Sequence, residues 1–176
     1  ADGVLSLGEA PEQPPLFDII GELLDNSLLR QNQTETGEIR YSLLESIRAY
    51  ATNKLSKPAE VDSELWGPQA LLDAQHKHAA YFSRLGKPES LRALKGFDSA
   101  EQWDRIFVEI DNLVAGIDYG TTDTAPLCCM AALKVLGMKG PVALGVDIAT
   151  QGMEIISKEN TYIDNLTLTS DGGRQS

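Results

Sequence analysis

The sequence predicts a mainly α-helical protein in which a helix, a β-hairpin and a second helix are followed by a helical arm. Three observations lead to this prediction. Apolar residues recur at helical spacing along most of the chain. Near the N-terminus, two short strand-like runs flank a polar linker that contains a glycine. Short segments with glycine and proline separate the remaining helical stretches.

The first helical stretch follows residues 1–15, which hold several prolines and show no periodicity. Its apolar residues share one helical face, and they are Leu16, Phe17, Ile19, Ile20, Leu23 and Leu24. Asn26 and Ser27 end it. Strands are expected at residues 27–31 and 38–43, joined by residues 32–37, in which Gly37 can supply a positive φ.

The next helix is expected over residues 44–55, and its inward residues are Leu44, Ile47, Tyr50, Ala51 and Leu55. A helix, a hairpin and a helix in this order are typical of the C-terminal half of a winged-helix module, which we assign to residues 1–57. Residues 58–68 are an acidic linker with proline, as is common between domains.

A helical, repeat-like domain is expected over residues 69–156, and its first helix opens at Gly67 and Pro68. The apolar residues of that helix are Leu71, Leu72, Ala79, Phe82 and Leu85. Two later helices, 125–136 and 142–156, flank a short glycine and proline turn, which is typical of an αα-hairpin. Residues 157–176 are polar and are expected to form a flexible tail.

Between these helices, Ser99 and Gln102 match a capping box that would start one continuous amphipathic helix ending near Gly120. Its apolar face consists of Trp103, Ile106, Phe107, Ile110, Leu113, Val114 and Ile117. Within it, Trp103, Phe107 and Ile110 are candidate partner-binding residues, because such a stripe forms either a core or a groove for a partner helix.

Three stretches in matching order resemble one protein family: residues 40–51 (RYSLLESIRAYA), 78–82 (HAAYF) and 109–115 (EIDNLVA). Residues 24–29 (LDNSLL) add a fourth. Together they resemble bacterial signal-transducing regulatory ATPases of the STAND and NB-ARC type, in the segment after the nucleotide-binding core. The resemblance implies a winged helix beside an ATPase core, followed by tetratricopeptide-like helices that bind partners.

The sequence departs from this family at one motif. In plant and animal relatives a Met-His-Asp motif opens the equivalent helix, and its histidine senses ADP. The matching positions here are Leu43, Leu44 and Glu45. Leucine has no hydrogen-bond donor in its side chain, so the resemblance does not extend to direct ADP sensing at this motif, and Arg40 and Arg48 stay open as residues that face the nucleotide.

Composition favours some classes of function over others. The 176 residues carry 26 acidic and 15 basic side chains, a net charge of −11, and no run of lysine or arginine. Phosphate backbones repel such a surface, so we expect protein partners rather than nucleic acid. No apolar run approaches the ~20 residues that span a bilayer. With no secretory signal at the first residues, we expect a cytoplasmic protein in which Cys128 and Cys129 are buried small hydrophobes.

We assign no catalytic, metal-binding or cofactor-binding residues from the sequence. It has no phosphate-binding loop and no nucleophile elbow of the form Gly-x-Ser-x-Gly. His76 and His78 are two residues apart, whereas a helical zinc pair needs a spacing of four. We expect His78 to pack beside Tyr81 and Phe82. Asp104, Glu109, Asp111 and Asp118 are expected to form a solvated helix face.

The function predicted from the sequence is a non-catalytic regulatory segment of a signal-transducing ATPase or transcriptional regulator, which couples nucleotide state to partner binding. Two alternatives stay open at this point. One is a DNA-binding winged-helix regulator that uses Arg30, Arg40 and Arg48. The other is a small enzyme of unrecognised type.

Overall fold

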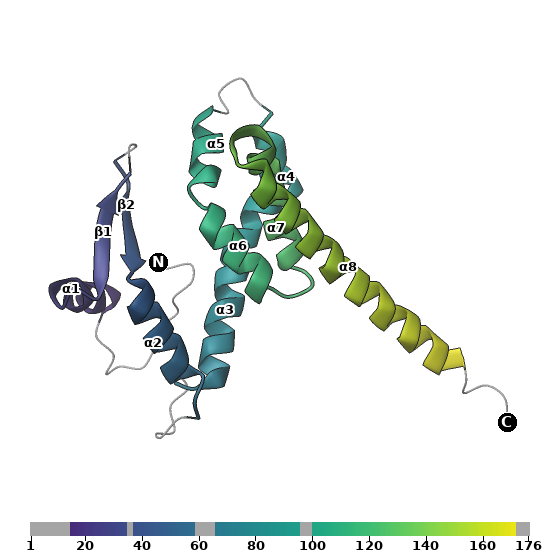
Figure 1. The fold of residues 1–176 in the computed structure, drawn as a ribbon, viewed down its shortest axis with the longest axis horizontal. Coiled ribbons are helices and arrows are strands. Elements are labelled where there is room, and N and C mark those ends of the chain that lie inside the picture. The colour runs from purple at the N-terminus through teal and green to yellow at the C-terminus, as the bar shows by residue number, and fades with distance from the viewer. Residues whose placement is uncertain (1–14, 35–36, 59–65, 96–99, 172–176) are drawn as a thin grey trace. The chain divides into compact units, whose positions relative to one another are not determined.

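The structure is a computed structural model that describes residues 15–34, 37–58, 66–95 and 100–171 (Figure 1). Over these residues the chain is mainly helical, with one two-stranded antiparallel sheet between helices, which confirms the predicted class at this coarse level. The chain divides into two compact units, residues 1–74 (unit 1) and 75–176 (unit 2). The described helices are all too short or too polar to cross a bilayer.

Unit 1 contains a helix, a β-hairpin and a second helix in chain order (Figure 1). The elements are α1 (Leu16–Asp25), β1 (Leu29–Gln33), β2 (Ile39–Leu43) and α2 (Glu45–Leu55). In the hairpin Leu29 lies opposite Leu43, and Gln33 lies opposite Ile39. Gly37 has φ +84° at the turn, so the predicted positive φ is confirmed there.

The first strand begins two residues later than predicted, because residues 26–28 form the C-terminal turn of α1. The Leu28 N–H donates to the Leu23 carbonyl at 2.8 Å, and the Ser27 N–H donates to the Leu24 carbonyl at 2.9 Å. This pair of bonds is a Schellman motif, which requires a left-handed residue, and Ser27 has φ +57°. Backbone donors that the prediction assigned to the strand therefore cap the helix.

The described residues of unit 1 contribute no fully buried apolar side chain to a core. Tyr50, which was predicted to face inward, is accordingly 63% exposed, and Phe17 on the predicted apolar face of the first helix is 81% exposed. A two-stranded hairpin between two short helices encloses too little volume to cover every apolar residue that helical periodicity places on one side.

Unit 2 holds the core of the described chain. Its elements are most of α3 (Pro68–Ser83), the 3₁₀ turn η1 (Arg84–Gly86), α4 (Pro88–Ala93), α5 (Ala100–Phe107), α6 (Ile110–Tyr119), α7 (Ala125–Lys139) and α8 (Val142–Asp171). The helix predicted to open at Gly67 and Pro68 is confirmed as α3, and Leu72 of its predicted apolar set is exposed. The short α4 was not predicted.

Helix α7 is central in unit 2, where it contacts η1, α5, α6 and α8. The fully buried side chains come mainly from α6, α7 and α8, and the largest are Leu113, Ile148, Val135 and Cys128. Helix α7 has neighbouring elements on several sides. Most of its small and apolar residues that face these neighbours are therefore buried.

The single helix predicted from Ala100 to Tyr119 is wrong, since α5 and α6 are separate helices. Between them the Glu109 N–H donates to the Ile106 carbonyl at 3.0 Å, an i to i−3 bond that tightens the chain and ends α5. A new helix starts at Ile110. The proposed capping residue Ser99 lies outside the described residues.

The predicted αα-hairpin is confirmed, because α7 and α8 are neighbours in contact, joined at Gly140 and Pro141. Both helices are longer than predicted. α7 continues to Lys139, and α8 continues past residue 156 to Asp171 (Figure 1). Residues 157–171 are polar but contain neither glycine nor proline, so no helix breaker occurs before residue 172.

Candidate protein-binding surfaces

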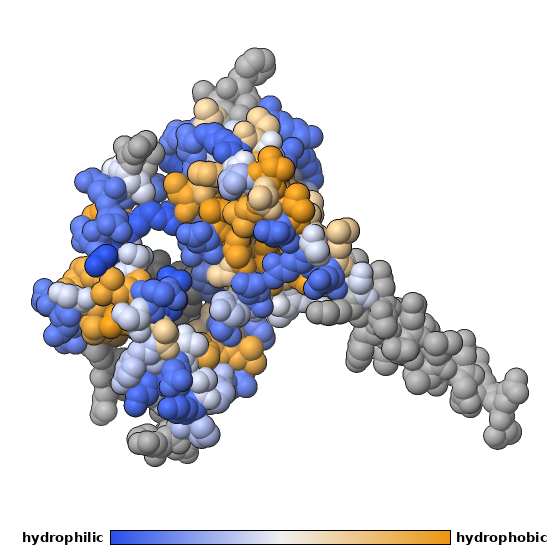
Figure 2. Space-filling view, viewed as in Figure 1, coloured by the Kyte–Doolittle hydropathy of each residue, from blue (hydrophilic) through white to orange (hydrophobic). Residues whose placement is uncertain are grey.

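One side of the α7–α8 hairpin carries exposed or half-exposed apolar residues. We call it the hairpin face, and it consists of Met130, Leu133 and Gly137 on α7 and Val142, Val146, Ala149 and Met153 on α8. The two sets recur at intervals of three or four residues, so each forms one stripe along its helix. Val142 is 78% exposed and Val146 is 58% exposed. Figure 2 shows apolar residues gathered over the start of α8.

The composition of α7 explains why this face exists. Its 15 residues include only two charged ones, Lys134 and Lys139, and its apolar residues surround the helix. Such a helix is normally buried on all sides. In this structure Val135 and Cys128 are buried, while Met130 on the opposite side is exposed. The exposed side of α7 therefore has the character of an interface.

The hairpin face is hollowed near the turn between its helices. A groove of about 320 Å³ is lined entirely by apolar residues and glycines, namely Leu133, Leu136, Gly137, Met138, Gly140, Val142, Gly145, Val146 and Ala149. Glycine and alanine leave room for the backbone of another helix to approach closely. Met138 contributes a flexible, unbranched side chain to the lining of the groove.

Charged side chains border the hairpin face on its two long edges. On α7, Cys129 and Leu136 face α8, since a Cβ added at Gly152 or Gly145 would touch them. Lys134 precedes Leu136 by two residues, which is about 200° around a helix, so it lies on the edge away from α8. By the same reasoning, Asp147 follows Gly145 by two residues and lies on the edge away from α7.

Lys134 and Asp147 also lie at the same level along the hairpin. Lys134 lies two residues before Leu136 on α7, and Asp147 lies two residues after Gly145 on α8. Because Gly145 neighbours Leu136 and the two helices run in opposite directions, both steps lead the same way along the hairpin. Both residues are exposed, and neither forms an ion pair with another described side chain. The face thus has one basic edge and one acidic edge, and Glu154 extends the acidic edge by two turns.

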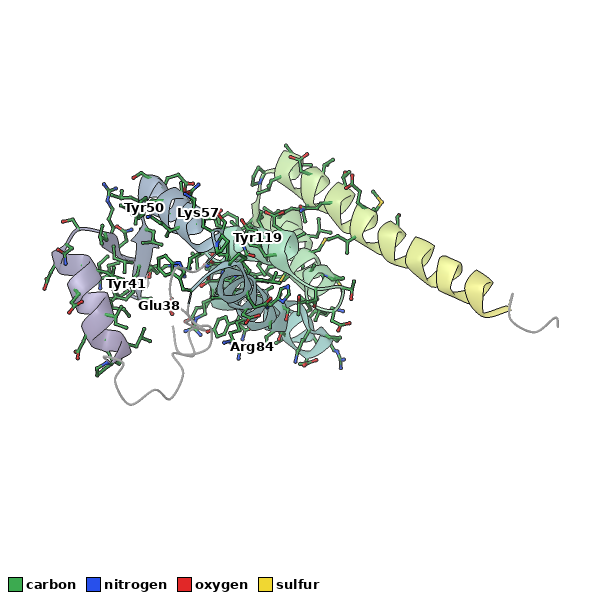
Figure 3. All side chains as sticks on the ribbon, turned by 90° about the horizontal axis from the view of Figure 1, so that it is seen from below. Glu38, Tyr41, Tyr50, Lys57, Arg84 and Tyr119 are labelled. Carbon is green, nitrogen blue, oxygen red and sulfur yellow. The ribbon has the colours of Figure 1, made fainter. Side chains whose placement is uncertain are left out.

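Unit 1 exposes a second apolar surface. Along β2 the residues Ile39, Tyr41 and Leu43 alternate with more buried ones and are all exposed, so they share one face of the hairpin. We call these three residues the β2 strip. Figure 3 labels Tyr41 on this strand and Tyr50 on α2. Unit 1 also contains a hollow of about 440 Å³ lined by Tyr50, Ala51, Lys54, Leu55 and Trp66.

The sequence-predicted partner-binding residues Trp103, Phe107 and Ile110 are distributed over two helices. Trp103 and Phe107 lie on α5, and Ile110 is the first residue of α6. All three are half-buried and pack against the core of unit 2. The structure thus places them beside the core, where each retains some exposed surface. Their role in partner binding stays a prediction.

The polar residues that were considered as candidate metal-binding or catalytic residues are dispersed over the structure. The ring of His78 lies 4.6 Å from that of Phe82, which confirms the predicted packing beside Phe82, and its Nε2 is 3.3 Å from Asn112 Oδ1. Asp104 pairs with Lys139, and Asp118 accepts a hydrogen bond from Gln151 at 2.6 Å. In the described part of the chain, no group of three or more His, Cys, Asp or Glu side chains is placed to hold a metal ion.

The two cysteines are buried and free, as predicted. Burial raises the pKa of the Cys128 thiol from its ordinary value of 9.0 to about 11, and the adjacent Cys129 adds to the shift. Burial raises the pKa of Cys129 as well. Because the thiolate is the form that attacks electrophiles and binds metals, both thiols are suited to packing rather than chemistry.

Sequence reasoning missed the hairpin face. The signal was present in α7, where Met130 and Leu133 lie opposite Val135 on an apolar helix, and in the spacing of Val142 and Val146. Periodicity shows that a helix has apolar residues on several sides. It does not show which of those sides lacks a neighbour within the same chain.

Comparison of the chain with known proteins finds no matching protein family, no matching curated protein and no matching solved structure.

Proposed function

We propose that this chain is a non-catalytic protein-interaction segment of a signal-transducing ATPase, and that it couples nucleotide state to partner binding. One observation carries the proposal: each of the two units exposes its own apolar surface, the β2 strip in unit 1 and the hairpin face in unit 2. Exposed apolar surfaces of this kind are typical of protein contact sites. A coupling segment needs two such sites, one for the ATPase core and one for the partner.

Unit 1 supplies the surface that docks on the ATPase core. The order α1, β1, β2, α2 supports a winged-helix module, because it matches the helix, hairpin and helix expected for the C-terminal half. A two-stranded sheet is marginally stable in water and needs further packing on its apolar face. Contact between the β2 strip and an ATPase core would provide that packing.

Unit 2 supplies the arm that binds a partner. Its antiparallel α7–α8 hairpin, in contact with α6 and α5 through α7, supports a tetratricopeptide-like arrangement. In such arrays each helical hairpin buries an apolar side against the next hairpin. The hairpin face has the apolar character of such a side.

Charge supports protein partners over nucleic acid. Residues 1–74 carry 13 acidic and 5 basic side chains, whereas residues 75–176 carry 13 acidic and 10 basic ones. Unit 1, which would contain a DNA-binding winged helix, is therefore the more acidic of the two. Non-specific DNA binding depends on lysine and arginine side chains that displace counterions from the phosphates. In unit 1 such basic side chains are outnumbered by acidic ones.

The test is hydrogen exchange, measured by mass spectrometry on the protein encoded by the complete reading frame that contains this chain. With ADP bound we expect the amides of β2 to be protected by the ATPase core. Replacing ADP with a non-hydrolysable ATP analogue should speed their exchange by about tenfold or more, because undocking uncovers the strand.

The matched control is the same experiment on the Tyr41→Asp variant, in which a charge on the β2 strip should remove the ADP-dependent protection. Amides of α7 in the core of unit 2 should exchange alike in all states. A protein that binds no adenine nucleotide would contradict the proposal, and so would β2 exchange that is the same with both nucleotides.

A further inference from the structure

We infer that the hairpin face binds the same face of a second copy of this chain, which gives a two-fold symmetric dimer with α7 of each copy over α8 of the other. The inference rests on the proposed role of this face in protein binding and names its occupant. Three features carry it: the shape of the face, the charges on its edges and the charge balance of unit 2.

The shape of the hairpin face suits helix-on-helix packing. The groove is lined in part by residues with little or no side chain, which allow a facing helix to approach: Gly137, Gly145 and Ala149. Val142, Val146 and Met130 project around it and are exposed. Two such hairpins, packed face to face, would form a four-helix bundle with a continuous apolar centre.

The edge charges select one symmetry for this bundle. A two-fold axis parallel to the helices places α7 of one copy over α8 of the other and preserves levels along the hairpin. Lys134 of each copy then meets the edge of its partner that carries Asp147, at the same level. A two-fold axis perpendicular to the helices in the interface would bring like edges together, which is unfavourable.

The charge balance of the two units also fits self-association through unit 2. Like charges oppose the pairing of identical molecules. Most of the net charge of −11 lies in unit 1, while unit 2 carries 13 acidic and 10 basic side chains. The face itself has no acidic residue within it. A basic partner would be expected for an acidic face, but this face carries charge of both signs on opposite edges.

The first test is sedimentation equilibrium on the 176-residue chain. We expect the wild type to be dimeric at about 100 µM and to dissociate on dilution. Val146→Asp, which places a charge in the centre of the face, should give a monomer at the same concentration. Because Val146 is exposed, the substitution should not prevent folding. The helix content and thermal midpoint of the variant, measured by circular dichroism, should therefore match those of the wild type.

The second test uses charge reversal and does not depend on the apolar centre. Lys134→Asp and Asp147→Lys should each weaken the dimer by about tenfold, because each brings two like-charged pairs together. A mixture of the two variants should associate at least as tightly as the wild type, since both cross-pairs in the heterodimer then join lysine to aspartate. Arg92→Asp on α4 makes an equal charge change elsewhere and should have no effect.

Three results would overturn the dimer: a monomeric wild type, a Val146→Asp variant that stays dimeric, or a mixture no tighter than its components. Suppose the wild type is monomeric and the hairpin-face amides gain protection in the complete protein. The face would then belong to another segment or protein, and the proposed function would stand. Suppose instead that the dimer forms and the exchange rate of the β2 amides is the same with both nucleotides. The proposed function would then fail while this inference holds.

Discussion

Gly116 lies on α6 where that helix meets α7. A Cβ at this position would lie 2.7 Å from the Cys128 sulfur, closer than such atoms approach in proteins. Gly152 on α8 stands in the same relation to Cys129, again at 2.7 Å. The two adjacent cysteines thus fill gaps left by glycines on different neighbouring helices, because successive residues of a helix point about 100° apart.

Gly116→Ala is expected to destabilise the protein by about 1–3 kcal/mol, because the added methyl group overpacks a site that has no free volume. The change should appear as a lower midpoint in urea unfolding monitored by circular dichroism. This expectation runs against helix propensity, which favours alanine over glycine.

The matched control for this prediction is Cys128→Ala in the same background. Removing the sulfur takes away the nearest atom to the new methyl group, so the double variant should be more stable than the sum of the two single effects implies. Additive effects would show that the overlap of Gly116 and Cys128 does not determine the cost.

Single residues were predicted from sequence where local chemistry decides their environment. Cysteines within an apolar stretch are buried, and His78 packs on Phe82, four residues away on the same helix. Phe17 was placed on an apolar helix face and Tyr50 was predicted to face inward, yet both are exposed. Periodicity identifies the face of a helix, whereas burial depends on whether another element covers that face.

At the scale of elements, the sequence predicts helices and turns well where glycine or proline marks a boundary. Gly67 and Pro68 start α3, and Gly140 and Pro141 separate α7 from α8. The break between α5 and α6 carries neither residue. It depends on a local 3₁₀-type bond at Glu109, a small rearrangement that hydrophobic spacing does not reveal.

The two sides of α8 should respond differently to the same kind of substitution. Ile148 faces the core and is fully buried, so Ile148→Ala should lower the free energy of unfolding by about 2–4 kcal/mol through lost burial and a cavity. Val142 is exposed, and Val142→Ala should change it by no more than about 0.5 kcal/mol.

Urea unfolding measures both variants of α8 at one protein concentration, low enough to keep the chain monomeric. Equal losses at the two positions would mean that the hairpin face is covered within the same chain. That outcome would contradict the exposed position of Val142 in the structure.

At the scale of the whole molecule, the two units differ in how much apolar surface they bury. Every fully buried apolar side chain of the described residues belongs to unit 2. The sequence predicts apolar faces in both units and does not distinguish them. The difference arises because α7 has neighbours on several sides, whereas β2 has one strand beside it, and such neighbours come from tertiary structure.

This difference predicts unequal protection from hydrogen exchange in the isolated chain. Amides of β1 and β2 should exchange with a free energy of opening near zero to about 2 kcal/mol, and amides of α7 near the global value. Mass spectrometry of peptides from both units can measure this at one pH. Strand amides that exchange as slowly as those of α7 would contradict the assignment of the core to unit 2.

The candidate surfaces were only partly accessible from sequence. A protein-binding role was predicted, and Trp103, Phe107 and Ile110 were selected because aromatic residues at helical spacing are conspicuous. The exposed residues on α7 and α8 are smaller, and their significance depends on what lies across from them. Absence of a neighbour is a property of the three-dimensional arrangement, which no local pattern encodes.

The uneven division of charge between the units has a kinetic consequence. An acidic unit 1 attracts a basic surface from a distance and so accelerates diffusional encounter with it. In the docking proposed above, the apolar β2 strip would govern how long the contact lasts. Salt shortens the range of that attraction to about 10 Å at 0.1 M ionic strength. If unit 1 docks on an ATPase core as proposed, ionic strength would therefore set the speed of docking and leave the residence time largely unchanged.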